Sequence, residues 1–152
     1  DPYVEKEKVK ISGAIPVDNI SENLQKMDAV TLHCPKNDET TDLFTKKEFD
    51  LMKKSSFIIN CARGGILNEE DLHEALTNKK IAGAGLDVFD VEPTPSSNPL
   101  FKLNNVILSP HIAGVTIEST VRMATETVQN VLDVLDDKIN QSVVVNNKEI
   151  GM

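Results

Sequence analysis

Three residues that can handle protons or bind anions each follow an apolar run of the chain. Arg63 comes shortly after one run, Glu92 after a second and His111 after a third. Each run has the length and apolar content of a buried parallel strand. Because ligands of α/β proteins bind outside the carboxyl ends of the strands, these three side chains are predicted to share one site.

Together, these residue types fit a carbonyl reduction on an organic acid. A histidine exchanges protons near neutral pH, and a neighbouring carboxylate favours its imidazolium form, which suits a general acid. An arginine presents a planar fork that binds a carboxylate through two hydrogen bonds. Taken alone, a histidine is more often structural, and Glu92 and Arg63 fit solvated surface charges equally well.

Strand-like and helical patterns alternate along the chain and would position these residues. A capping box at Thr45 and the cap residue Asn68 begin two helices, and Thr116 begins an apolar-striped helix of about five turns. The alternation predicts parallel βαβ units, and hence the α/β class with a doubly wound parallel sheet. Strands are expected at 29–35, 56–62, 81–89 and 106–108, with short extended pieces at 9–15 and 143–147.

Gly83 and Gly85 resemble part of a glycine fingerprint for dinucleotides, but their context differs. That fingerprint is G-x-G-x-x-G between a strand and a helix, whereas the third position here is Val88 and the glycines lie inside a strand-like run. Close packing against the backbone is the better explanation. Asp1 stands where a ribose-binding acid would follow such a fingerprint, so the sheet is expected to be incomplete at the N-terminus.

Composition disfavours several classes of protein. The chain has 152 residues, enough for one domain with a core, and its net charge of −8 disfavours nucleic acid or an anionic membrane as a partner. We expect neither a membrane span nor a signal peptide. Two cysteines, Cys34 and Cys61, and three scattered histidines predict reduced thiols, no metal site and a cytoplasmic location.

Four motifs, in their order and spacing, resemble the D-isomer-specific 2-hydroxyacid dehydrogenases, which include phosphoglycerate, hydroxypyruvate and D-lactate dehydrogenases. The motifs are Leu32-His33-Cys34-Pro35, Ile59-Asn60-Cys61-Ala62-Arg63-Gly64-Gly65, Gly85-Leu86-Asp87-Val88-Phe89 through Glu92-Pro93, and Ser109-Pro110-His111-Ile112-Ala113-Gly114. The resemblance covers nearly the whole chain and implies a Rossmann-like NAD-binding domain. It also implies NAD as the cofactor and hydride transfer between a D-2-hydroxy acid and its 2-oxo acid.

The resemblance implies roles for individual residues. Arg63 matches the arginine that binds the substrate's carboxylate and carbonyl oxygen, His111 the general acid/base, and Glu92 the acid paired with it. Asp87 matches the carboxylate near the nicotinamide carboxamide, and Asp1 matches the ribose-binding acid, which favours NAD over NADP. The positions that match the lining of the cofactor cleft are Pro35, Cys61, Ala62, His111 and Gly114.

The family's glycine fingerprint and its substrate-binding domain have no counterpart in the sequence. We therefore expect residues 1–140 to be a partial NAD-binding domain and 141–152 a tail leading toward the substrate domain, so that this piece alone is inactive. A homodimer acting on small 2-oxo or 2-hydroxy acids is expected. The alternative is a non-catalytic NAD-binding sensor or corepressor, although retention of all three catalytic residues favours the enzyme.

Overall fold

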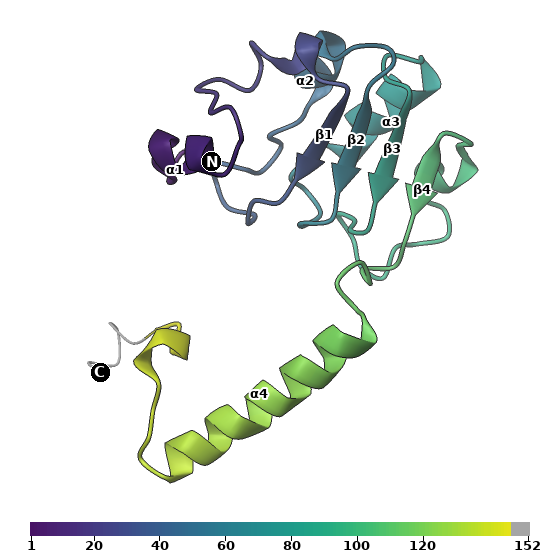
Figure 1. Cartoon of the computed structure of the whole chain (residues 1–152). Helices are drawn as coiled ribbons and strands as arrows, with labels where there is room; N and C mark the ends of the chain where they lie inside the picture. Colours follow the sequence, from purple (N-terminus) through teal and green to yellow (C-terminus); the bar gives the residue numbers. More distant parts are fainter. Residues whose placement is uncertain (147–152) are drawn as a thin grey trace. The chain divides into compact units, whose positions relative to one another are not determined.

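The computed structural model describes residues 1–146, which fall into two compact units (Figure 1). The first runs from Asp1 to Ala113 and contains the sheet, and the second begins at Gly114. The elements of the first unit are α1 (Lys6–Ile11), a 3₁₀ turn at Leu24–Lys26, β1 (Ala29–Leu32), α2 (Lys46–Leu51), β2 (Phe57–Asn60), α3 (Glu69–Thr77), β3 (Gly83–Leu86), a 3₁₀ turn at Pro99–Lys102 and β4 (Val106–Leu108). The second unit contains α4 (Ile117–Leu135) and a 3₁₀ turn at Gln141–Val143.

The four strands form one parallel sheet in the order β1-β2-β3-β4, which confirms the α/β class. Gly83 and Gly85 lie inside β3, as the sequence predicted. One row of the sheet joins the last residues of the strands, Leu32, Asn60, Leu86 and Leu108. The carboxyl ends therefore meet at one edge, and the loops that carry the expected site residues leave from that edge.

The core lies against one face of the sheet. Ile58 and Leu86 from this face are buried in one cluster with Phe49 of α2 and Leu72 of α3, and Figure 1 shows both helices on the same side of the strands. Both helices begin where the sequence predicted. The Glu48 carboxylate accepts hydrogen bonds from the N–H and hydroxyl of Thr45, at 3.2 and 2.7 Å, and the Asn68 side chain accepts the Asp71 N–H.

Both predicted extended pieces overlap helical turns in the structure, so each is wrong where it begins. Part of the first forms α1, in which Lys10 Nζ and Glu7 Oε1 make an ion pair of 2.6 Å across one turn. Such pairs three residues apart favour a helix over an extended chain. The second piece begins with Val143 as the last residue of a 3₁₀ turn (Gln141–Val143) capped by Asn140, and Val144 after it is extended. The end of that prediction lies outside the described residues.

Three strands are shorter than predicted, and β3 shows why. It ends at Leu86, and the buried residues Asp87, Val88 and Phe89 lie beyond it. The Phe89 N–H donates to the Glu92 carboxylate, 2.9 Å away. An apolar run can continue as a buried loop when side chains satisfy its backbone groups. The hydrophobic pattern alone does not separate that case from a strand.

Candidate active site

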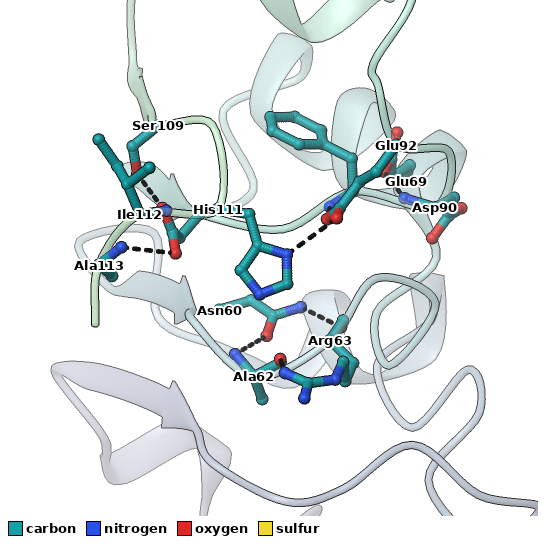
Figure 2. Close-up of polar contacts among 12 residues, drawn as sticks. Asn60, Ala62, Arg63, Glu69, Asp90, Glu92, Ser109, His111, Ile112 and Ala113 are labelled. Atoms are coloured by element: carbon teal, nitrogen blue, oxygen red, sulfur yellow. Dashed lines mark hydrogen bonds and ion pairs between the residues drawn. The ribbon is translucent and has the colours of Figure 1, made fainter. Parts of the chain in front are cut away.

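Backbone hydrogen bonds hold three segments together at the carboxyl edge of the sheet. The Asp87 N–H donates to the carbonyl of Asn60 (3.0 Å), and the Ser109 N–H donates to the carbonyl of Leu86 (2.9 Å). The His111 N–H donates to the carbonyl of Asp87 (2.7 Å). The segments that follow β2, β3 and β4 therefore leave the sheet side by side, and their side chains surround one site (Figure 2).

The structure brings Glu92 and His111 into contact. His111 Nδ1 lies 2.8 Å from Glu92 Oε2 (Figure 2), and Glu92 Oε1 accepts the Phe89 N–H. The hydrogen bond with His111 and that from the Phe89 N–H hold the pKa of Glu92 below its ordinary value. Glu92 is thus a carboxylate at neutral pH and only accepts hydrogen bonds. The Nδ1 atom of His111 therefore carries the hydrogen, and Nε2 is left to exchange a proton with a bound molecule.

Asp87 makes four of the hydrogen bonds that hold the turn carrying His111. His111 has a φ of 56°, in the left-handed region that non-glycine residues seldom adopt. The Asp87 carbonyl accepts the His111 N–H, and the Asp87 carboxylate accepts the Ser109 hydroxyl (2.6 Å), the Ile112 N–H (2.8 Å) and the Ala113 N–H (2.9 Å). These bonds fix the turn in a conformation that aims the imidazole at Glu92.

Asp87 is buried, and only 3% of its surface is exposed. Burial acts to raise the pKa of its carboxyl, but the hydrogen bonds from Ser109, Ala113 and Ile112 outweigh burial and hold that pKa below its ordinary value. Both carboxylate oxygens are occupied by donors of this chain. The geometry thus gives Asp87 a task in holding the turn, and its expected contact with the cofactor stays a prediction.

Arg63 lies in the exposed segment after β2. Its Nη1 donates to the carbonyl of Ala62 (2.6 Å), and its own carbonyl accepts the side-chain amide of Asn60 (2.9 Å). Within residues 1–146, no hydrogen bond or ion pair joins Arg63 to Glu92 or His111. The guanidinium therefore keeps donors available for an anionic ligand.

Two residues that shape the site were missed by sequence reasoning, Asn60 and Ser109. Asn60 is 1% exposed, and its side chain bonds both the Arg63 carbonyl and the Ala62 N–H (3.0 Å). Ser109 donates to Asp87. Asn60 could have been found from the sequence, because a polar residue at the end of a buried apolar strand must form hydrogen bonds with neighbouring groups. Ser109 had none.

The Arg63 turn and the Glu92 loop meet backbone to backbone at Gly64. A Cβ at Gly64 would overlap the carbonyl of Phe89, and Gly65 has a φ of 76°. We therefore expect Gly64→Ala to separate the two segments and lower the free energy of unfolding by about 3 kcal/mol, measured by urea denaturation. The control is Gly114→Ala, since a Cβ there meets no atom of residues 1–146 within 4 Å apart from those of the adjacent residues. Equal losses in both variants would contradict this explanation.

The remaining expected cofactor residues occupy less constrained positions. Cys61 and Pro35 are exposed after β2 and β1, and Ala62 is buried. The Asp1 carboxylate accepts the Tyr3 N–H (2.9 Å). Gly114 belongs to the second unit, where its carbonyl accepts the Ser119 hydroxyl. The exposed positions after β1 and β2 fit a cofactor that lies along the carboxyl edge, as it does in α/β sheets.

A groove of about 670 Å³ runs beside the Glu92–His111 pair, within the size range of small-molecule sites. Glu92 and His111 line it together with Phe89 and Phe101, whose rings stack edge to face with centroids 6.1 Å apart. Among residues 1–146, no group of three or more His, Cys, Asp or Glu side chains could hold a metal ion. None of the helices within these residues meets the length and hydropathy that a membrane span requires.

Comparison with known proteins identifies close relatives. A D-3-phosphoglycerate dehydrogenase of Methanocaldococcus jannaschii is 40% identical over 144 residues, which are 95% of this chain and 27% of that protein. A glyoxylate reductase of Thermofilum pendens is 43% identical over 127 residues, 84% of this chain and 37% of that protein. The chain therefore spans less than half the length of these relatives.

Solved structures that superpose on this chain also include dehydrogenases of this kind. A D-lactate dehydrogenase of a Sporolactobacillus species superposes with a TM-score of 0.82 at 32% identity, over 91% of this chain and 45% of that one. The NAD-complexed form of a D-isomer-specific 2-hydroxyacid dehydrogenase of Lactobacillus delbrueckii ssp. bulgaricus superposes with a TM-score of 0.81 at 28% identity, over 95% of this chain and 47% of that one. The family model for the NAD binding domain matches residues 1–113. This chain belongs to the D-isomer specific 2-hydroxyacid dehydrogenase family, through its NAD binding domain.

Proposed function

We propose that the chain is the greater part of the coenzyme domain of a dehydrogenase that interconverts a D-2-hydroxy acid and its 2-oxo acid. The observation that carries the proposal is the Glu92–His111 pair at the carboxyl edge of the sheet. Residues 1–140 belong to this domain, and 141–152 lead toward a substrate domain. The relatives are named as dehydrogenases and reductases, so the sensor or corepressor alternative is not favoured.

Each residue of the trio has a distinct task in this reaction. Nε2 of His111 gives its proton to the carbonyl oxygen of the 2-oxo acid during reduction and takes it back during oxidation. Glu92 stabilises the imidazolium through Nδ1, and Arg63 binds the substrate carboxylate. Bound NAD(H) supplies or accepts the hydride. Asp1, Pro35, Cys61 and Ala62 line its site, and the Asp1 carboxylate favours NAD over NADP.

The test is turnover with purified protein. The full-length protein that contains this chain is expected to oxidise NADH with glyoxylate, hydroxypyruvate or pyruvate, and to reduce NAD with D- but not L-2-hydroxy acids. The 152-residue chain alone is expected to show no measurable turnover, because its relatives are two to four times as long. Saturable NADH binding without turnover by the full-length protein would favour the sensor.

Arg63 gives a prediction on substrate binding. Arg63→Lys keeps the charge but loses the two-pronged geometry, so KM for the 2-oxo acid is expected to rise about 30-fold with a smaller change in kcat. Steady-state kinetics of the full-length protein measure this. Arg122→Lys is the matched control, because Arg122 is the other arginine of the sequence and lies outside the four motifs. A variant Arg63→Lys with an unchanged KM would remove Arg63 from the substrate site.

The assembly and location follow as further parts of the proposal. We propose a homodimer, supported by the apolar stripe of α4, on which Val121, Val128, Val131 and Leu135 are more than half exposed. A monomer by light scattering would count against it. Both cysteines, Cys34 and Cys61, are free thiols, which is typical of proteins from a reducing compartment and supports a cytoplasmic location.

A further inference from the structure

We propose that Glu69, the first residue of α3, is a positioning residue for the acid–base pair. Its carboxylate holds both ends of the loop that carries Glu92, and through this loop it maintains the contact between Glu92 and His111. The structural part of this inference stands on its own, and its effect on catalysis rests on the proposed function.

The two oxygens of Glu69 bind the two ends of the loop separately. Oε1 accepts the Asp90 N–H at 2.6 Å, and Oε2 accepts the side-chain amide of Asn98 at 3.0 Å. Figure 2 shows Glu69 beside Asp90, behind the Glu92 side chain. Between these anchors the loop contains no helix or strand, and Glu92 lies inside it. Without Glu69, the chain from Asp90 to Asn98 loses both of these anchors.

The helix gives Glu69 a fixed base. α3 is capped by Asn68 and is packed into the core through Leu72 and Leu76, which are 0% and 2% exposed. Glu69 stands in the first turn, where a carboxylate is stabilised by the free N–H groups of the helix. A side chain on a rigid, buried helix therefore locates a loop that has no regular structure of its own.

The charges around Glu69 indicate that its side chain is positioned by its hydrogen bonds to Asp90 and Asn98 and not by an ion pair. Burial, and then the negative charge of Glu69, raise the pKa of Asp90, while the Gly65 N–H and the Lys36 ammonium act against them. Two carboxyl groups thus stand close together at an energetic cost. No ion pair to Glu69 occurs among residues 1–146, so its contacts are hydrogen bonds to the loop.

The test is a ¹³C NMR pH titration of the side-chain carboxyl groups in the 152-residue chain, for Glu69→Ala, Glu69→Gln and the control Glu70→Ala. Glu70 is the next residue along the helix and is exposed. Glu48 is the internal reference. Burial acts to raise its pKa, but hydrogen bonds from Thr45 hold it below its ordinary value, at a separate position at the start of α2.

We expect the pKa of Glu92 to rise toward that of an ordinary glutamate in Glu69→Ala, because the released loop loses its contacts with His111 and Phe89. Glu69→Gln keeps one acceptor oxygen and is expected to give a smaller rise. The pKa of Asp90 is expected to fall in both variants. Removing a negative charge alone lowers the pKa of nearby carboxyls, so opposite movements of Glu92 and Asp90 report release of the loop.

An unchanged or lowered pKa of Glu92 in folded Glu69→Ala overturns the proposal, as does an equal rise in Glu70→Ala. If Glu69→Ala does not fold, Glu69→Gln decides by the same criteria. In the full-length protein, kcat/KM is expected to fall about tenfold in Glu69→Ala with the NADH dissociation constant unchanged. Wild-type protein without turnover would refute the proposed function and leave the titration result intact.

Discussion

Replacing His111 with alanine is expected to lower kcat of the full-length protein by about 10²- to 10⁴-fold, with a much smaller change in the dissociation constant of NADH. The range is that of a general acid removed from a reaction that needs one. NADH binding is expected to weaken only slightly, because His111 is one of several positions that match the cofactor cleft, whereas its Nε2 is the atom left for the substrate once Nδ1 bonds Glu92. Stopped-flow kinetics with a 2-oxo acid and NADH fluorescence titration measure the two quantities.

Two companion variants separate the role of His111 from a general loss of structure. His73→Ala changes a histidine on α3 and is expected to keep the wild-type rate. Glu92→Gln keeps the shape of the pair but loses the negative charge that stabilises the imidazolium, so its rate is expected to fall less than that of His111→Ala. If His111→Ala retains a tenth or more of kcat, another group donates the proton and the mechanism is wrong.

The part of this fold that the sequence predicted is the part governed by periodicity. Parallel strands that are buried give continuous apolar runs, and the capping residues Thr45, Asn68 and Thr116 gave the starts of three helices. The edge that joins Arg63, Glu92 and His111 followed from strand order, since consecutive βαβ units place the carboxyl ends together.

The part that could not be predicted depends on hydrogen bonds between distant residues. Nothing in the hydrophobic pattern distinguishes Glu69 from Glu70. They differ in which carboxylate reaches the Asp90 N–H, and Asp90 lies 21 residues after Glu69 in the sequence. The segment after β3 was expected to be strand because Val88 and Phe89 are apolar, but Glu92 satisfies the Phe89 N–H and allows a buried loop. The hydrophobic periodicity predicts which residues are buried, but it does not predict the hydrogen-bond partner of each backbone group.

Asp87→Asn is expected to be the most destabilising change at this site that keeps side-chain size. Oδ1 accepts two donors and Oδ2 accepts the Ala113 N–H, so an amide places its own NH₂ against a donor in either orientation. The buried N–H that loses its acceptor costs about 3 kcal/mol of the free energy of unfolding at pH 7, measured by urea denaturation. The turn that holds His111 at positive φ is expected to loosen at the same time, which lowers kcat.

The pH dependence of the lost stability identifies the ionised carboxylate of Asp87 as its cause. The pKa of Asp87 is lower in the folded chain than its ordinary value of 3.8, so the stability it contributes is fully present above that value and is lost as pH falls through the folded pKa. The difference between wild type and Asp87→Asn should therefore be constant from neutral pH to about pH 5 and should shrink below about pH 4. Asp38→Asn, at an exposed loop position, is expected to change neither the free energy of unfolding nor its dependence on pH. A difference that persists unchanged at low pH would mean that shape, and not the ionised carboxylate, holds the His111 turn.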